Sequence, residues 1–357
     1  MFLKKLNPNF FFNYLFIQVL VHIVYKITFL DQIEGHFNIS KNLFNEKSSL
    51  TQFFIESPLL LILGNVLNIE TLDRYLIITY LFTQFFILLI CLELDFLGDW
   101  SSLLLISGWV VTISWFVGYV DILSVYILII ICKKILKNNV DITLSLLFLI
   151  LTLNHYAIAL FSIITIGILY IHKNLKNYLI FSITPFMFGF FLMNRFLNHI
   201  NFSGRSRIRF IFNDGVLKSS VEFISSNFLE YLWSGFLGVI FLFLYLLFKK
   251  PWTQSRQYLI SLLLMIGATG LGLDTSRIFS ILLVPLTIKV IYDFKNSELT
   301  KNLNSKLIIF ISTVSTLFFQ ERHIYGKVNI ESPNTESKDF YELIPQLVNS
   351  VFSNIWS

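Results

Sequence analysis

The sequence contains few charged residues and very little cysteine. Only 14% of its 357 residues are Asp, Glu, Lys or Arg. The two cysteines, Cys91 and Cys132, lie within or at the end of apolar runs, and the chain has neither a CxxC motif nor a His/Cys spacing typical of a metal site. This pattern excludes a disulfide-stapled scaffold and a zinc-binding module. We interpret both thiols as small buried hydrophobic groups.

The sequence also has no basic tract interleaved with aromatic residues, although its net charge is +5. Lysines in the loops between apolar runs explain this charge, as they do in the cytoplasmic loops of membrane proteins. We therefore expect no nucleic-acid partner.

Apolar residues dominate instead, at 55% of the chain, and the mean hydropathy is +0.71. A soluble domain of this length could not bury so much apolar surface. Apolar runs of about 20 residues recur along the chain, and this is the length of a helix that crosses a bilayer. The runs are too long and too continuous for barrel strands. The sequence therefore predicts an all-α polytopic membrane protein surrounded by membrane lipids.

The apolar runs predict about eleven transmembrane helices. Residues 53–69 are interrupted by polar residues, Pro58 and Gly64, and are expected to form an interfacial helix that does not cross the membrane. The predicted crossings are residues 10–30, 75–92, 101–116, 121–132, 142–153, 158–171, 178–196, 231–248, 258–271, 278–291 and 307–319.

Lysines are concentrated in every second loop, and this distribution predicts the orientation of the helices in the membrane. The N-terminus is expected in the cytoplasm, and the first run is expected to stay uncleaved because no small-x-small site follows it. One loop, residues 93–100, is expected inside although it is acidic. If residues 53–69 cross after all, every later loop inverts. The basic inner residues are Lys4 and Lys5, then Lys133, Lys134 and Lys137, then Lys173 and Lys176, then Lys249, Lys250 and Arg256, and last Lys295, Lys301 and Lys306.

The predicted organisation is an integral membrane domain, residues 1–320, and a short polar tail on the outer side, residues 321–357. The membrane domain has a first outer loop at 31–74 and a large outer loop at 194–230. We expect a multi-pass protein of the plasma membrane or the bacterial inner membrane.

Polar residues at the ends of the apolar runs gather on the predicted outer side. Charged groups at a membrane edge are costly and usually face a cavity or a partner, so we expect an outward-opening polar cavity. The alternative is that polar residues merely end helices. The residues concerned are Asp31, Glu34, Asp121, Asn154, His155, Asp274 and Arg277.

Asp31 and Glu34 follow the first apolar run and would share a helix face if that helix continued. Paired carboxylates can act as a general base and its electrostatic or metal partner. His36 belongs either to this cluster or to a plain loop. Asp121, three residues after Gly118, could instead cap a helix N-terminus.

Asn154 and His155 mark an expected tight turn. Arg277 could bind phosphate oxygens in a bidentate manner, or pair locally with Asp274. Arg205 and Arg207, with Arg209, lie at alternate positions of the large outer loop and could hold a phosphate or an anionic headgroup. The alternative for these arginines is a solvated stripe.

Together these features resemble the GT-C superfamily of membrane glycosyltransferases. That family has an acidic residue after the first span, here Asp31 with Glu34 as a second candidate. It also has interfacial helices in the first outer loop, here 53–69, and a Gly-x-x-Asp pattern, here Gly118 and Asp121. Outer-face arginines that contact the lipid phosphate correspond to Arg277 or Arg205. The chain departs from the family in lacking a sizeable C-terminal soluble domain.

The resemblance implies sugar transfer from a polyprenyl-phosphate-linked donor to an acceptor at the outer face. Asp31 would be the base or the partner of a divalent metal ion, and no other cofactor is expected. Arg277, Arg205 and Arg207 would bind phosphate, with Asp121, His155 and Asp274 completing the substrate site. The alternatives are an O-antigen-type polymerase or ligase that relies on the loop arginines, a lipid-linked-sugar flippase or transporter, and a scaffold without chemistry.

Overall fold

A computed structural model describes residues 8–29, 33–41, 43, 58–119, 121–170, 174–199, 216–271, 275–297, 300, 305–318, 323–325, 328–330 and 345. The fold in these ranges is helical apart from one short antiparallel hairpin. The elements of the first half are α1 (Pro8–Val19), the π-helical turn η2 (Leu20–Val24), α2 (Ile33–Lys41), α4 (Pro58–Val66), α5 (Leu72–Glu93), the 3-10 segment η3 (Leu94–Trp100), α6 (Ser101–Leu105), α7 (Trp109–Trp115), α8 (Asp121–Leu136), α9 (Ile142–Tyr170) and α10 (Leu175–His199).

The second half contains shorter helices and the hairpin. Its elements are α12 (Val216–Ser226), α13 (Phe228–Phe236), the 3-10 turn η4 (Leu237–Val239), α14 (Ile240–Lys249), α15 (Trp252–Thr269), α16 (Thr275–Leu282), α17 (Val284–Lys295), α18 (Ser305–Phe318), β1 (His323–Tyr325) and β2 (Val328–Ile330). The hairpin lies in the predicted polar tail, where the sequence analysis expected no strands.

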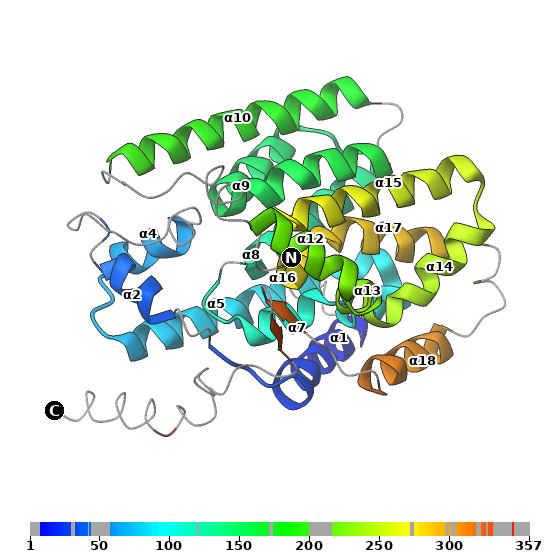
Figure 1. Cartoon of the computed structure of the whole chain (residues 1–357), viewed down its shortest axis with the longest axis horizontal. Helices are drawn as coiled ribbons and strands as arrows, with labels where there is room; N and C mark the ends of the chain where they lie inside the picture. The colour runs from blue at the N-terminus through cyan, green and yellow to red at the C-terminus, as the bar shows by residue number, and fades with distance from the viewer. Residues whose placement is uncertain are drawn as a thin grey trace.

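Among the described residues, four helical segments have the length and apolar composition to cross a membrane: Leu72–Leu105, Ile142–Tyr170, Leu175–His199 and Phe228–Lys249. Figure 1 shows α10 along one side of the helical body with α9 beneath it, and α1 and α18 on the opposite side. Met187 and Phe188 of α10 are more than half exposed. Such apolar surface is unfavourable in water and suits lipid. The protein is a helical membrane protein, as the composition predicts.

The first apolar run is helical only as far as Val24, not to Leu30 as expected. Lys26 has a positive φ of 59°, and the chain after it is extended. This extended stretch pairs with the end of α7: Thr28 N–H donates to the Ser114 carbonyl at 3.0 Å, and Trp115 Nε1 donates to the Tyr25 carbonyl at 2.9 Å. The first helix therefore ends at Val24, because tertiary hydrogen bonds replace those of a further helical turn. Glu34 lies in the separate helix α2, and Asp31 lies outside the described residues.

Two predicted crossings are interrupted. Residues 101–116 form α6 and α7, separated at Gly108, whose N–H donates to the Gly235 carbonyl at 3.0 Å. A Cβ at Gly108 would lie 2.0 Å from the Ser234 carbonyl oxygen, so only glycine permits this approach. Residues 231–248 are likewise broken at Leu237, which has a φ of 47°. A single continuous helix is therefore wrong for both segments, and the break before α7 contacts the end of α13 through Gly108 and Gly235.

Helix α9 bends at His155, where φ is −161° and ψ is 91°. The Tyr178 ring lies 6.1 Å from the Phe148 ring, and the Tyr178 hydroxyl donates to the Ile163 carbonyl at 2.7 Å. A straight helix would separate residues 148 and 163 by about 22 Å, too far for one side chain to reach both. The chain therefore folds back at His155 into two arms, which matches the turn expected there.

Helix α4 is nine residues long. At about 1.5 Å per residue it reaches less than half of the hydrocarbon core, so it cannot cross. It packs on α2, where Ser40 Oγ donates to the Leu61 carbonyl at 2.9 Å and Asn65 Nδ2 donates to the Ser40 carbonyl at 2.9 Å. This pairing agrees with an interfacial element, although residues 53–57 lie outside the described ranges.

Gly118, just before α8, packs against the first turn of α2 in the first loop. Phe29 forms a parallel bridge with Val117, which brings α2 beside Gly118. Gly118 has a φ of +113°, and a Cβ there would lie 2.5 Å from Ile33 Cδ1. The positive φ therefore requires glycine, and any Cβ at this position would also displace the end of the Ile33 side chain.

We expect Gly118→Ala to destabilise the protein by about 1–3 kcal/mol through backbone strain and the clash with Ile33. The measurement is thermal unfolding of purified protein in detergent. Gly267→Ala is the matched control, because Gly267 lies in α15 with open space at its Cβ position, and it should be neutral or stabilising. Equal stabilities for the Gly118 variant and the wild type would contradict the role given to Gly118.

Candidate functional site

The strongest polar feature is an ion pair between Asp121, the first residue of α8, and Arg277 of α16. Arg277 Nε donates to Asp121 Oδ2 at 2.6 Å, and Nη2 donates to Oδ1 at 3.3 Å. The arginine side chain is 8% exposed and the aspartate 4% exposed. Bidentate geometry offsets part of the large cost of removing both charges from water.

Tyr119 connects this pair to the first loop. The Arg277 guanidinium carbon lies 3.7 Å from the centre of the Tyr119 ring, a cation–π contact. The His36 ring meets Tyr119 edge-on, with ring centres 5.2 Å apart and planes at 89°. We call His36, Tyr119, Asp121 and Arg277 the Asp121–Arg277 cluster. It joins α2, α8 and α16, which are far apart in the sequence.

Asn154 of α9 contacts Ser124, which lies one helical turn beyond Asp121 on α8. Asn154 Nδ2 donates to Ser124 Oγ at 2.8 Å, and Asn154 is fully buried. His155 Nδ1 accepts the Ile158 N–H at 3.4 Å, so the imidazole caps the second arm of α9. The turn predicted at these residues is therefore held by side-chain hydrogen bonds, and the Asn154 amide lies close to the cluster.

The predicted site residues are thus brought together only in part. Asp121 and Arg277 are in contact, and Glu34 is exposed on the first turn of α2, the helix that carries His36. Among the described residues Asp121 is a partner of Arg277; the other expected partner, Asp274, lies outside them. Asp31, Arg205 and Arg207 lie outside them as well.

The sequence analysis missed Tyr119 and left His36 as a possible loop residue. His36 lies in α2 and is 5% exposed. The signal available for Tyr119 was its place between Gly118 and Asp121, two residues that the sequence analysis singled out. No pattern within residues 118–121 shows that this neighbour is an arginine from α16.

A second polar group lies at the other end of α8. Lys133 Nζ donates to the Glu93 carboxylate at 2.9 Å and also binds Asp95. Lys295 Nζ donates to the Phe96 carbonyl at 3.0 Å. The acidic segment 93–100 therefore contacts lysines from two loops that were expected on the same side as it. Residues 121 and 133 of α8 are about 18 Å apart, so these polar groups are separate from the cluster.

Within the described ranges, no three His, Cys, Asp or Glu side chains are close enough together to hold a metal ion. No protein-family model matches the chain, and neither a curated protein nor a solved structure matches it.

We expect Arg277→Leu to destabilise the protein by about 3–5 kcal/mol, because it leaves the buried Asp121 carboxylate without its counter-charge. The double variant Asp121→Leu/Arg277→Leu should recover much of the loss, since it removes both buried charges. Thermal unfolding in detergent measures both effects. Lys218→Ala is the control, because Lys218 and Glu222 form an exposed pair, and it should change stability by less than about 0.5 kcal/mol. Purely additive losses in the double variant would contradict this account.

His36 should make stability depend on pH. Burial, and to a smaller extent the Arg277 charge, lower the pKa of His36 from 6.5 to about 3. Below pH 6.5 the unfolded chain binds a proton at this ring while the folded protein does not, so stability falls as the pH falls towards 3. The loss between pH 6.5 and 5 should be about 2 kcal/mol.

The measurement is the unfolding midpoint as a function of pH in wild type and His36→Gln. The variant should lose this part of the pH dependence. His199→Gln, at an exposed histidine, should retain it. Identical pH profiles for wild type and His36→Gln would show that His36 is not kept neutral by burial.

Proposed function

We propose that the chain crosses the membrane about eleven times with its N-terminus in the cytoplasm, in a plasma membrane or bacterial inner membrane. The separation of the two polar groups along α8 supports this orientation. Lys133 and Lys295, from predicted inner loops, meet at one end, and the Asp121–Arg277 cluster lies at the other. The short α4 and the fold-back at His155 agree with the same count.

At the outer end we propose an integral membrane glycosyltransferase that uses a polyprenyl-phosphate-linked sugar. The observation that carries this proposal is the buried Asp121–Arg277 pair directly beneath the first loop. Charged pairs at a membrane edge are costly, and functional sites are where they are usually retained. Here the pair supports, through Tyr119, the loop in which the resemblance puts the acidic residue.

The proposed reaction is a direct transfer. A carboxylate, Asp31 in first place and Glu34 in second, takes the proton of an acceptor hydroxyl. The acceptor oxygen then forms a bond to the anomeric carbon of the donor sugar. The bond from that carbon to the phosphate oxygen breaks, and polyprenyl phosphate leaves with the electron pair.

Two kinds of arginine would serve the leaving phosphate. Arg205 and Arg207 would bind its oxygens directly. Arg277 would act from its fixed place beneath Tyr119, where Asp121 holds the guanidinium in one orientation, so that its charge needs no reorganisation during the reaction. Asp121, His155 and Asp274 would line the remaining substrate site.

We expect Asp31→Asn to lower sugar transfer by about 100-fold or more, because it removes the general base without changing the size of the side chain. The assay uses sealed vesicles and a polyprenyl-phosphate donor with a labelled sugar. It measures transfer of the labelled sugar to an acceptor or to water. Vesicles with the outer face exposed should use an impermeant acceptor, and inverted vesicles should need permeabilising. Expression and thermal stability should be unchanged.

Asp73→Asn is the matched control, an exposed acid of the same loop that has no proposed role, and it should keep wild-type activity. Glu34→Gln tests the second candidate base. Full activity in both Asp31→Asn and Glu34→Gln would refute the mechanism. If activity then depended on Arg205 and Arg207 instead, a polymerase or ligase of lipid-linked polysaccharide would replace it.

A further inference from the structure

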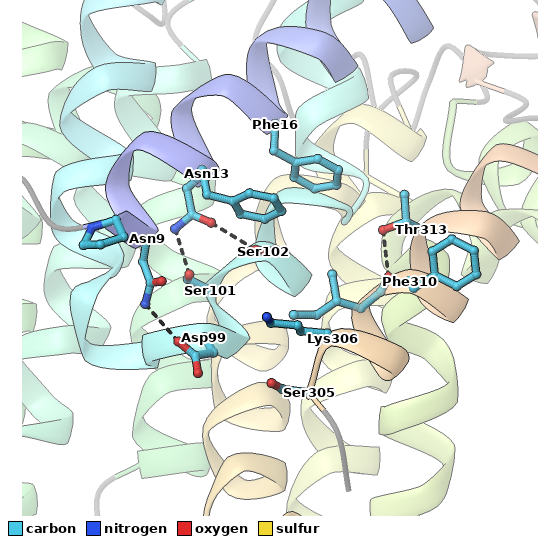
Figure 2. A pocket seen from close by; sticks show the side chains of 13 residues that line it. Asn9, Asn13, Phe16, Asp99, Ser101, Ser102, Ser305, Lys306, Phe310 and Thr313 are labelled. Atoms are coloured by element: carbon cyan, nitrogen blue, oxygen red, sulfur yellow. Dashed lines mark hydrogen bonds between the residues drawn. The ribbon is translucent and has the colours of Figure 1, made fainter.

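A cavity of about 600 Å³ opens between α1, α6 and α18. Figure 2 shows the side chains that surround it. Its volume is in the range of small-molecule sites, about 300–1,000 Å³. Asn9 Nδ2 donates to Asp99 Oδ1 at 3.0 Å, which puts the cavity beside segment 93–100. It therefore lies at the Lys133 end of α8, away from the Asp121–Arg277 cluster.

One part of the cavity wall is apolar. Phe12 and Phe16 of α1 face Ile309 and Phe310 of α18 across it. Phe12 is 55% exposed and Phe310 is 64% exposed, so the apolar wall continues onto the outer surface of the protein. A flexible hydrocarbon chain could enter sideways from the bilayer, because both rims are lipid-compatible.

The opposite part is polar and held by hydrogen bonds. Asn13 Nδ2 donates to Ser101 Oγ at 2.7 Å, and Ser102 Oγ donates to Asn13 Oδ1 at 3.0 Å. All three residues are buried, which makes this floor rigid. Near it stand one acid, Asp99, and one base, Lys306 of the first turn of α18.

We propose that this cavity binds one phospholipid with a phosphoethanolamine headgroup, drawn from the adjacent membrane leaflet. Lys306 would bind the lipid phosphate, and Asp99 with the Asn9 carbonyl oxygen would accept hydrogen bonds from the lipid ammonium. One acyl chain would lie between the phenylalanines.

The single acid and single base select this headgroup over other lipids. An anionic lipid or a polyprenyl phosphate would satisfy Lys306 but would be repelled by Asp99. A choline headgroup carries a positive charge but has no N–H to donate. A sterol would leave both charged side chains without a ligand partner. The proposal does not depend on glycosyl transfer, because its residues lie at the other end of α8.

The test is native mass spectrometry of the purified full-length protein in mild detergent. Phosphatidylethanolamine, phosphatidylcholine and phosphatidylglycerol with identical acyl chains are added in competition. We expect one phosphatidylethanolamine per chain, held about tenfold more tightly than either competitor, as expected for a charge-assisted hydrogen bond. Lys306→Gln should weaken binding of phosphatidylethanolamine by about tenfold.

Two further variants separate the headgroup from the chain. Asp99→Asn should abolish the preference for ethanolamine over glycerol while lipid still binds. Thr313→Trp, which fills the cavity from α18, should prevent lipid binding altogether. Lys218→Gln and Glu222→Gln are matched charge controls at exposed positions and should retain wild-type binding.

The competition on wild-type protein decides the matter even if a variant fails to fold. Equal retention of the three lipids, or several weakly held lipids in place of one, would mean surrounding bilayer lipid only and would overturn the proposal. Unchanged retention in a folded Thr313→Trp protein would overturn it as well.

Discussion

The buried pair of Asp121 and Arg277 sets the strongest constraint on this fold. Its two members are 156 positions apart in the sequence and are almost fully removed from solvent. A charge in such a place is tolerated only if its partner is held at hydrogen-bond distance, so α8 and α16 must keep a fixed relation. Tyr119 and His36 extend this constraint to α2. The first loop is therefore docked at the end of the helical body.

The sequence predicts a membrane side for each polar group, which stays a prediction, but it does not predict the partner of each group. Lysine distribution is a property of single loops, so it can be read along the chain. For Arg277 the sequence offered phosphate binding or a local pair with Asp274, and it gave no sign of the contact with Asp121. A pair between α8 and α16 depends on how two helices pack, and neither local charge nor apolar length contains that information.

Breaks inside apolar runs could not be predicted either, because they too depend on contacts between distant segments. Residues 106–108 and 237–239 interrupt predicted crossings, yet the apolar character continues through both. The breaks are fixed by contact of Gly108 with Gly235 and Ser234, a contact between distant segments. The turn at Asn154 and His155 was predictable because polar residues interrupt the run there. Apolar length thus indicates that a segment belongs in the membrane without showing whether its helix is continuous.

The acidic segment 93–100 shows how an apparent exception can support a rule. Its acids conflicted with the positive charge expected on the inner side. In the fold Glu93 and Asp95 bind Lys133, and the backbone of the same segment binds Lys295. Glu93 and Asp95 therefore pair with a lysine that the sequence analysis predicts on the same, inner side of the membrane. A count of charges in each loop could not reveal this pairing.

The two ends of α8 satisfy their charges in different ways. At the Asp121 end the acid and base bind each other directly, so the charges are compensated within the protein and the neighbouring loop is held in place. At the other end Asp99 and Lys306 stand on the rim of a cavity whose apolar wall reaches the lipid-facing surface. A closed pair favours a preorganised site, because nothing must rearrange when a reactant arrives. An acid and a base that line one cavity fit a bound molecule that carries both charges, so we propose chemistry at the first end and lipid recognition at the second.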